Sequence, residues 1–211
     1  MGPTIATISH PNLRHNIKLI RNAVGTGKIM AVVKANGYGH GDIEISKTAI
    51  NCGCEYLGVA FVEEGIKLRQ AGISHPILVF GAHHNEHLKS AIENDLEITI
   101  SSDKQIHYLE GLSSVKKQIP VHIKIDTGMN RVGYQPDIFE KNFQNILNNP
   151  IFKIKGIYSH LSSADETDNT YTDLQISRFV EIKSFIESKY PKEVLFHLAN
   201  SAAIMKSPRA Y

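Results

Sequence analysis

The sequence predicts an α/β fold in which strand–helix units build a parallel sheet that approaches a (β/α)8 TIM-like barrel. Two observations support this. Short apolar runs recur along the chain, and the segments between them carry apolar residues with a period near 3.6, which is typical of amphipathic helices. The chain has 211 residues, of which 42% are hydrophobic, enough for one substantial core. We therefore expect a single barrel domain over residues 1–211.

The apolar runs predict seven strands, which in chain order cover residues 29–33, 56–60, 76–80, 96–100, 121–125, 155–159 and 194–197. A first helix is expected at residues 12–24, after an opening segment at residues 4–8. The helices between strands are expected at residues 42–51, 62–71, 85–94, 102–114, 136–148 and 172–190. A complete barrel of this type needs one more strand. The sequence therefore predicts a barrel whose last strand is missing.

Lys34 lies where the first predicted strand, residues 29–33, opens into a turn that contains Gly37, Gly39 and Gly41. A lysine at the end of a buried strand is half-desolvated, and burial favours the neutral amine, which can attack a carbonyl group. The glycines allow close backbone approach, and we expect consecutive N–H groups of the turn to face an anion. The alternative is a lysine that simply extends into solvent.

A dinucleotide-binding turn is a competing interpretation of the same segment. Such a turn also follows a strand and requires an acidic residue about twenty positions later, where Glu63 and Glu64 occur. The position that needs its third glycine is occupied by Asp42, and this kind of turn has no role for Lys34. These departures disfavour a nucleotide site.

Polar residues also follow several other predicted strands. In a βα barrel, functional groups gather at the carboxyl ends of the strands. We therefore expect one site to receive side chains from distant parts of the chain: Lys34, Lys124, Asp126, His160, His197 and Asn200.

Five ordered segments resemble the N-terminal barrel of the alanine racemases, which are fold-type III pyridoxal-phosphate enzymes. The first is Ala-Val-Val-Lys-Ala-Asn-Gly-Tyr-Gly-His-Gly at residues 31–41, similar to the cofactor attachment signature of the family. The second, at residues 59–72, is similar to the second barrel strand and helix of the family. Another strong signature is Lys-Ile-Asp-Thr-Gly-Met-Asn-Arg-Val-Gly at residues 124–133, followed by residues 158–166 and 197–203.

The resemblance implies a role for each matching residue. Lys34 forms a Schiff base with pyridoxal 5'-phosphate and acts as a catalytic base. The other implied cofactor-side residues are Tyr38 and Ser201 at the phosphate, His160 beside the ring, Asn200, Arg131 at the cofactor hydroxyl and the substrate, and Lys124 as a lysine that is carbamylated in some members. No metal is implied.

The resemblance also implies a reaction, the interconversion of L- and D-alanine that supplies D-alanine for peptidoglycan. In the family, a tyrosine from the C-terminal β domain of the other subunit of a homodimer provides the second base. That domain is not recognised here, so we expect the chain alone to be deficient in racemisation. A related pyridoxal-phosphate-binding barrel, or a racemase of another small amino acid such as serine, is the alternative.

Composition excludes several classes of function. A net charge of +2 indicates neither a nucleic-acid partner nor an acidic one. No apolar run of about eighteen residues suggests a membrane span, and the chain begins without a signal peptide, so we expect a cytoplasmic protein. His83, His84 and His87 lie near Glu86 but lack a third ligand set in register, which disfavours a metal site.

Overall fold

The computed structural model describes residues 4–81, 85–112, 118–190 and 192–211. Its strands form one parallel sheet in which each strand pairs with the next along the chain. The seven strands are β1 (Met30–Val32), β2 (Tyr56–Val59), β3 (Ile77–Val79), β4 (Glu97–Ile100), β5 (Ile119–Lys124), β6 (Phe152–Tyr158) and β7 (Leu195–His197). The predicted set of strands and the barrel-type fold are confirmed.

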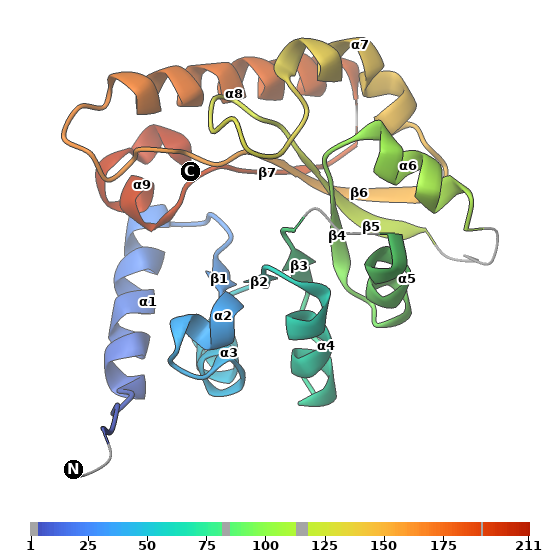
Figure 1. The fold of residues 1–211 in the computed structure, drawn as a ribbon. Helices are drawn as coiled ribbons and strands as arrows, with labels where there is room; N and C mark the ends of the chain where they lie inside the picture. The colour runs from blue at the N-terminus through green and yellow to red at the C-terminus, as the bar shows by residue number, and fades with distance from the viewer. Residues whose placement is uncertain (1–3, 82–84, 113–117, 191) are drawn as a thin grey trace.

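The sheet curves, and the helices that follow the strands cover its outer side (Figure 1). Because both faces of such a sheet are covered, its strands read as continuous apolar runs rather than alternating ones. Every residue of β2, β3 and β4 is buried. Leu57, Ile77 and Ile98 are fully enclosed in the main core, and burying each side chain stabilises the fold by about 1.5–3 kcal/mol.

The predicted helices also form, with small shifts at their ends. They are α1 (His10–Val24), α3 (Asp42–Asn51), α4 (Val62–Gln70), α5 (Asn85–Glu93), α6 (Asp103–Glu110), α7 (Pro136–Leu147) and α8 (Thr170–Lys189). Helix α1 begins earlier than predicted because the Ser9 hydroxyl accepts the Asn12 N–H at 3.3 Å and a proline occupies the first turn. Part of the predicted 102–114 helix falls on residues 113–117, which lie outside the described residues.

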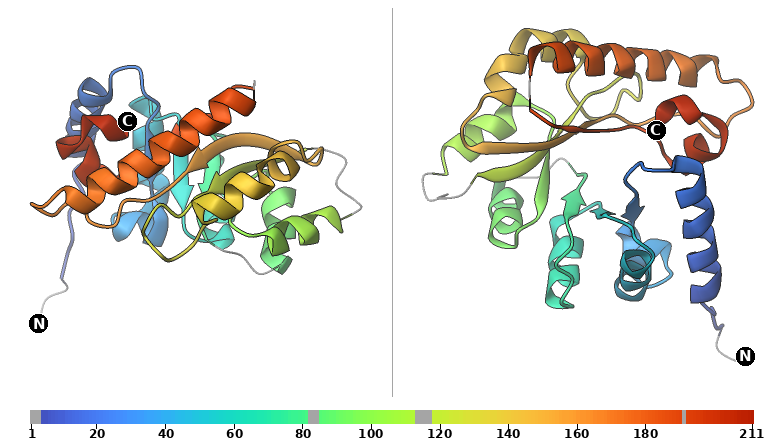
Figure 2. Two further views of the ribbon diagram at one scale, coloured as in Figure 1. Left: turned by 90° about the horizontal axis from the view of Figure 1, so that it is seen from above. Right: turned by 180° about the vertical axis from the view of Figure 1, so that it is seen from behind.

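Three short elements were not predicted: α2 (Lys34–Tyr38), α9 (Ser201–Lys206) and the 3-10 turn η1 (Pro208–Ala210). Helix α9 lies against one end of α1 at the open side of the curved sheet, which Figure 2 shows from two further directions. Among the described residues, no helix is both long and apolar enough to cross a membrane. His83 and His84 lie outside the described residues, so their arrangement is not part of the fold described here.

Candidate active site

Lys34 lies at the carboxyl end of β1, at the point where the backbone leaves the sheet. The preceding residue, Val33, is buried, and its N–H still donates to the Gly58 carbonyl of β2 at 2.8 Å. The Lys34 side chain is partly buried, and its Nζ lies 5.9 Å from the centre of the Tyr38 ring. The amine is therefore anchored by the sheet and directed beside a tyrosine that is itself 58% exposed.

The turn after Lys34 has a left-handed backbone over four consecutive residues. Ala35, Asn36, Gly37 and Tyr38 have φ values of 52°, 55°, 61° and 54°. This region is unfavourable for residues that carry a Cβ, and a run of such residues is uncommon. The segment is thus a strained turn in which Gly37 and, to a lesser degree, Asn36 have residue types that tolerate the geometry, whereas Ala35 and Tyr38 do not.

The expected anion-facing backbone N–H groups are not free in this turn. The N–H groups of its later residues donate to backbone carbonyls within the turn and at the end of β1, at 2.9–3.1 Å: Gly37 to Val33, Gly39 to Ala35 and Asn36, His40 to Gly37, and Gly41 to Asn36. The expectation was therefore wrong for these groups. The glycines serve the left-handed backbone, with φ values of 86° and 89° at Gly39 and Gly41.

Lys124 ends β5 and is 6% exposed. Its Nζ lies 4.6 Å from the centre of the Tyr158 ring, a cation–π contact with the neighbouring strand. The pKa of Lys124 is lowered to about 8, mainly by burial; the Asp126 carboxylate acts against this shift and the Arg131 guanidinium contributes to it. Lys124 is therefore a lysine with an appreciable neutral fraction near neutral pH.

His160 follows β6 and lies within the electrostatic influence of Lys34, Lys124 and Arg131. Its pKa is lowered to about 4, mainly by burial and then, in decreasing order, by the charges of Lys124, Arg131 and Lys34. The imidazole is therefore neutral at pH 7. The ends of β1, β5 and β6 thus bring together the three predicted cations and the predicted histidine, and such a cluster favours an anionic ligand.

The loop after β5 is organised by Asp126, a carboxylate that is 4% exposed. Its Oδ1 accepts the N–H groups of Gly128 and Asn130 at 2.9 and 3.0 Å, and its Oδ2 accepts that of Arg131 at 3.0 Å. The loop also closes on itself, since the Asp126 N–H donates to the Tyr134 carbonyl at 2.8 Å. Asp126 therefore fixes the backbone position from which the Arg131 side chain extends.

On the inner side of the sheet, the partly buried His197 ends a chain of polar side chains that the sequence did not indicate. The Glu97 carboxylate lies 2.8 Å from His122 Nε2, and His122 Nδ1 lies 2.9 Å from His197 Nε2. His197 stacks on Tyr158 with ring centres 4.7 Å apart, and burial lowers its pKa well below the usual value. A carboxylate accepts from Nε2–H of His122, which leaves Nδ1 of a neutral ring to accept from His197.

Asn200 and Ser201 lie where β7 leads into α9. The Asn200 Oδ1 accepts the Ala203 N–H at 3.0 Å, and its Nδ2 lies 3.5 Å from the Leu161 carbonyl, so the side chain caps α9. Ser201 is exposed at the first position of that helix. The structure thus gives Asn200 a structural task and leaves the Ser201 side chain at the surface.

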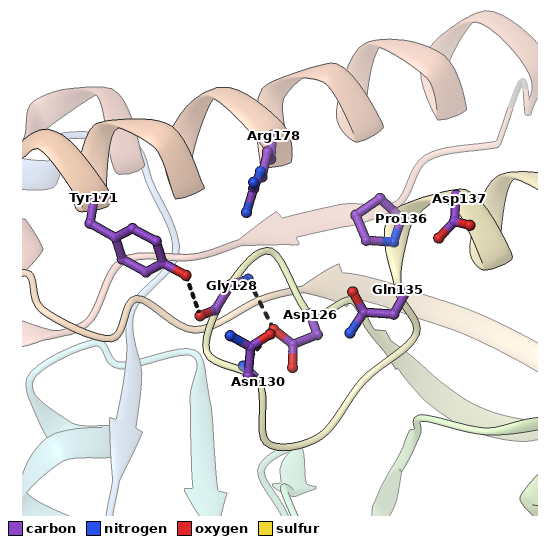
Figure 3. Close-up of a pocket in the computed structure, with 8 residues that line it drawn as sticks. All are labelled: Asp126, Gly128, Asn130, Gln135, Pro136, Asp137, Tyr171 and Arg178. Carbon is purple, nitrogen blue, oxygen red and sulfur yellow. Dashed lines mark hydrogen bonds between the residues drawn. The ribbon is translucent and has the colours of Figure 1, made fainter.

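A cavity of about 490 Å³ lies between the loop after β5 and helix α8 (Figure 3). The Tyr171 hydroxyl donates to the Gly128 carbonyl at 2.7 Å across one end of it, and Arg178 lines it from α8. A second cavity of about 490 Å³ is lined by Arg131 and Asn130, on the same loop. Lys34 lines neither cavity, so its amine and these two cavities are separate features of the surface.

Comparisons with known proteins place these features in a family. The family described as "Alanine racemase, N-terminal domain" matches residues 8–211. Alanine racemase of Carboxydothermus hydrogenoformans is 36% identical over 212 residues, covering 100% of this chain and 57% of the relative. Alanine racemase of Desulforamulus reducens is 38% identical, covering 99% and 57%. The chain therefore spans little more than half the length of the curated relatives it matches.

Solved structures agree with the sequence comparison. Alanine racemase of Clostridium difficile 630 matches with a TM-score of 0.89 and 33% identity, over 95% of this chain and 53% of that one. Alanine racemase of Bacillus anthracis with bound L-Ala-P matches with a TM-score of 0.87 and 29% identity, over 97% and 55%. This chain, with its left-handed turn after Lys34 and its cation cluster, belongs to the alanine racemase N-terminal domain family.

Proposed function

We propose that residues 1–211 form the cofactor-bearing barrel of a pyridoxal-phosphate-dependent racemase that interconverts L- and D-alanine. One observation carries this proposal: a primary amine at the end of β1 stands in the same electrostatic environment as Lys124, Arg131 and a neutral His160. A positively charged cluster beside a reactive amine suits a ligand that joins an aldehyde to a phosphate. It also suits an amino-acid substrate with a carboxylate.

The residues present fit this cofactor in chemical type. Lys34 supplies the amine that would hold the cofactor aldehyde, and the hydroxyl groups of Tyr38 and Ser201 are neutral donors that would bind its phosphate. Asn200 would hold Ser201 in place through its cap on α9. When bound, the cofactor withdraws electrons from the substrate Cα and so makes its hydrogen acidic.

The chain's own side chains then have distinct tasks. Lys34 would take a proton from the substrate Cα or return one to it. His160, neutral at pH 7 because its pKa is about 4, presents an uncharged ring beside the cofactor. Arg131 is always charged and offers a planar fork to the cofactor hydroxyl and the substrate carboxylate. Among the described residues, Lys34 is the one to which we assign the role of a catalytic base.

We further propose that Lys124 is carbamylated. With a pKa of about 8, about a tenth of this amine is neutral at pH 7. The neutral nitrogen bonds to the carbon of CO2 and loses one proton to solvent, which leaves a carbamate anion. That anion would partner the nearby Arg131 charge, which in the unmodified protein acts against Lys124.

The proposal extends to the whole protein as a cytoplasmic homodimer that acts on alanine and supplies D-alanine for peptidoglycan. Its support is the family membership and the relatives that carry the name alanine racemase. A structural relative with bound L-Ala-P also supports a small amino acid as the substrate.

Exchange of the alanine Cα hydrogen in deuterated water tests the proposal. The protein is supplied with pyridoxal phosphate and either enantiomer of alanine, and deuterium at Cα is followed by NMR. We expect exchange that the Lys34→Ala variant abolishes, with slower exchange for serine. Exchange that persists in Lys34→Ala, or protein-bound cofactor without any exchange, would contradict the assignment; faster exchange with serine would identify a serine racemase instead.

A further inference from the structure

Glu64 connects the strained turn after Lys34 to the next strand–helix unit. Its Oε1 accepts the Ala35 N–H at 2.6 Å, and its Oε2 accepts the N–H groups of Ala60 and Phe61 at 2.7 and 3.0 Å. Ala35 directly follows Lys34, whereas the other two residues lie between β2 and α4. One carboxylate therefore joins the backbone beside the reactive lysine to the neighbouring strand.

Helix capping explains only part of this arrangement. Glu64 is the third residue of α4, and a glutamate at this position ordinarily bonds back to the N–H of the residue that caps the helix, here Phe61. That task occupies one oxygen. The other oxygen leaves its own helix and accepts the N–H of Ala35, a bond strengthened by the carboxylate charge.

The turn that receives this bond needs external support. Ala35 and Tyr38 hold left-handed backbone conformations that are unfavourable for residues with a Cβ, and Asn36, which tolerates this region better, lies between them. The later N–H groups of the turn find partners within it, as in any helical turn, but the N–H of Ala35 at its start has no such partner. Glu64 fills this position, so it stabilises the left-handed form at the residue where that form begins.

We propose that Glu64 is a positioning residue for Lys34, a latch that keeps the turn left-handed. In that form the turn places the centre of the Tyr38 ring 5.9 Å from the Lys34 Nζ. Without the latch, the turn relaxes toward ordinary backbone conformations, and the two side chains lose their fixed relation. The inference rests on the proposed function in one respect, that Lys34 is the residue that holds the cofactor.

The Glu64→Gln variant removes the latch, because the amide nitrogen meets the Ala35 N–H as a second donor. The matched control is Glu63→Gln, which changes an exposed carboxylate in the same helical turn. The rate at which pyridoxal phosphate becomes fixed to Lys34 is measured by borohydride trapping. We expect Glu64→Gln to slow capture roughly tenfold to a hundredfold, since a charge-assisted hydrogen bond is lost, and Glu63→Gln to change it less than about twofold.

A second variant separates positioning from simple stabilisation of α4. Glycine adopts the left-handed region freely, so adding Ala35→Gly to Glu64→Gln should restore most of the capture rate. The amide oxygen still accepts the Ala60 and Phe61 N–H groups in both variants, so helix capping should be kept, and the unfolding midpoint should differ little between the single and the double variant. Capture that Glu64→Gln leaves unchanged, or a double variant that recovers nothing, would overturn the latch.

Amide hydrogen exchange measures the protection of the Ala35 N–H, and so tests the latch, without the cofactor. The Ala35 N–H should be protected in the wild type and in Glu63→Gln, and should exchange faster in Glu64→Gln. If wild-type Lys34 captures no cofactor, the proposed function fails; if it captures cofactor and Ala35 is equally protected in all three proteins, the latch alone fails.

Discussion

Replacing Asp126 by asparagine should loosen the loop that carries Arg131. The buried carboxylate accepts three backbone N–H groups, two at Oδ1 and that of Arg131 at Oδ2. An amide oxygen can keep the first two, but the amide nitrogen would face the Arg131 N–H as a second donor. Losing one hydrogen bond to a charged group costs about 1.5–3 kcal/mol, and the unpaired donors add roughly 1 kcal/mol. We therefore expect the free energy of unfolding to fall by about 2–4 kcal/mol.

Urea denaturation followed by circular dichroism at pH 7 measures this loss, and the corresponding fall in Tm is about 5–15 °C for a chain of this size. The control is Asp137→Asn, whose side chain is 71% exposed and which should change stability by less than about 0.5 kcal/mol. The pKa of Lys124 should also fall, because Asp126 supports its charge. Equal stability of the two variants would refute the role given to Asp126.

Three further predictions concern backbone and buried charge. Gly133→Ala should destabilise the fold by about 2–4 kcal/mol in urea, because φ is +131° and the new Cβ would lie 2.8 Å from the Asp126 nitrogen; a neutral effect would contradict this. An NMR titration should place the pKa of His160 near 4. Since that pKa is lowered from 6.5, the stability it contributes is present above pH 6.5 and is lost as the pH falls toward 4, and a midpoint near 6.5 would refute the burial argument. Glu97→Leu should cost about 1–3 kcal/mol by leaving His122 Nε2–H unpaired, and Glu97→Gln, which keeps an acceptor, should cost less; the reverse order would contradict the pairing.

The strands were predictable because apolar residues occur in the sequence at the segments that the fold buries. Segments such as residues 56–60 and 96–100 are apolar enough to be read as enclosed strands, and the structure buries them on both faces. Helix ends were less predictable, since they depend on single side-chain bonds such as that of Ser9 to the Asn12 N–H. The order of strands followed from the regular alternation of strands and helices.

The candidate site was predictable where residues lie at strand ends, and not where they pair across the fold. Lys34, Lys124 and His160 were expected at one mouth because each follows a strand. Glu97 and His122 are polar residues inside apolar strands, and nothing near them in sequence indicates that they pair. Glycines at alternate positions predicted a turn after Lys34, but they did not reveal that Ala35 would also be left-handed or that Glu64 would hold it.

The position of the cofactor on the chain tests the central claim most directly. The protein is incubated with pyridoxal phosphate, reduced with borohydride, digested, and mapped by tandem mass spectrometry. We predict a pyridoxyl group on Lys34 in the wild type and no specific label in Lys34→Ala. A label on Lys124 or another lysine, or no label in the wild type, would contradict the assignment of Lys34 as the residue that holds the cofactor.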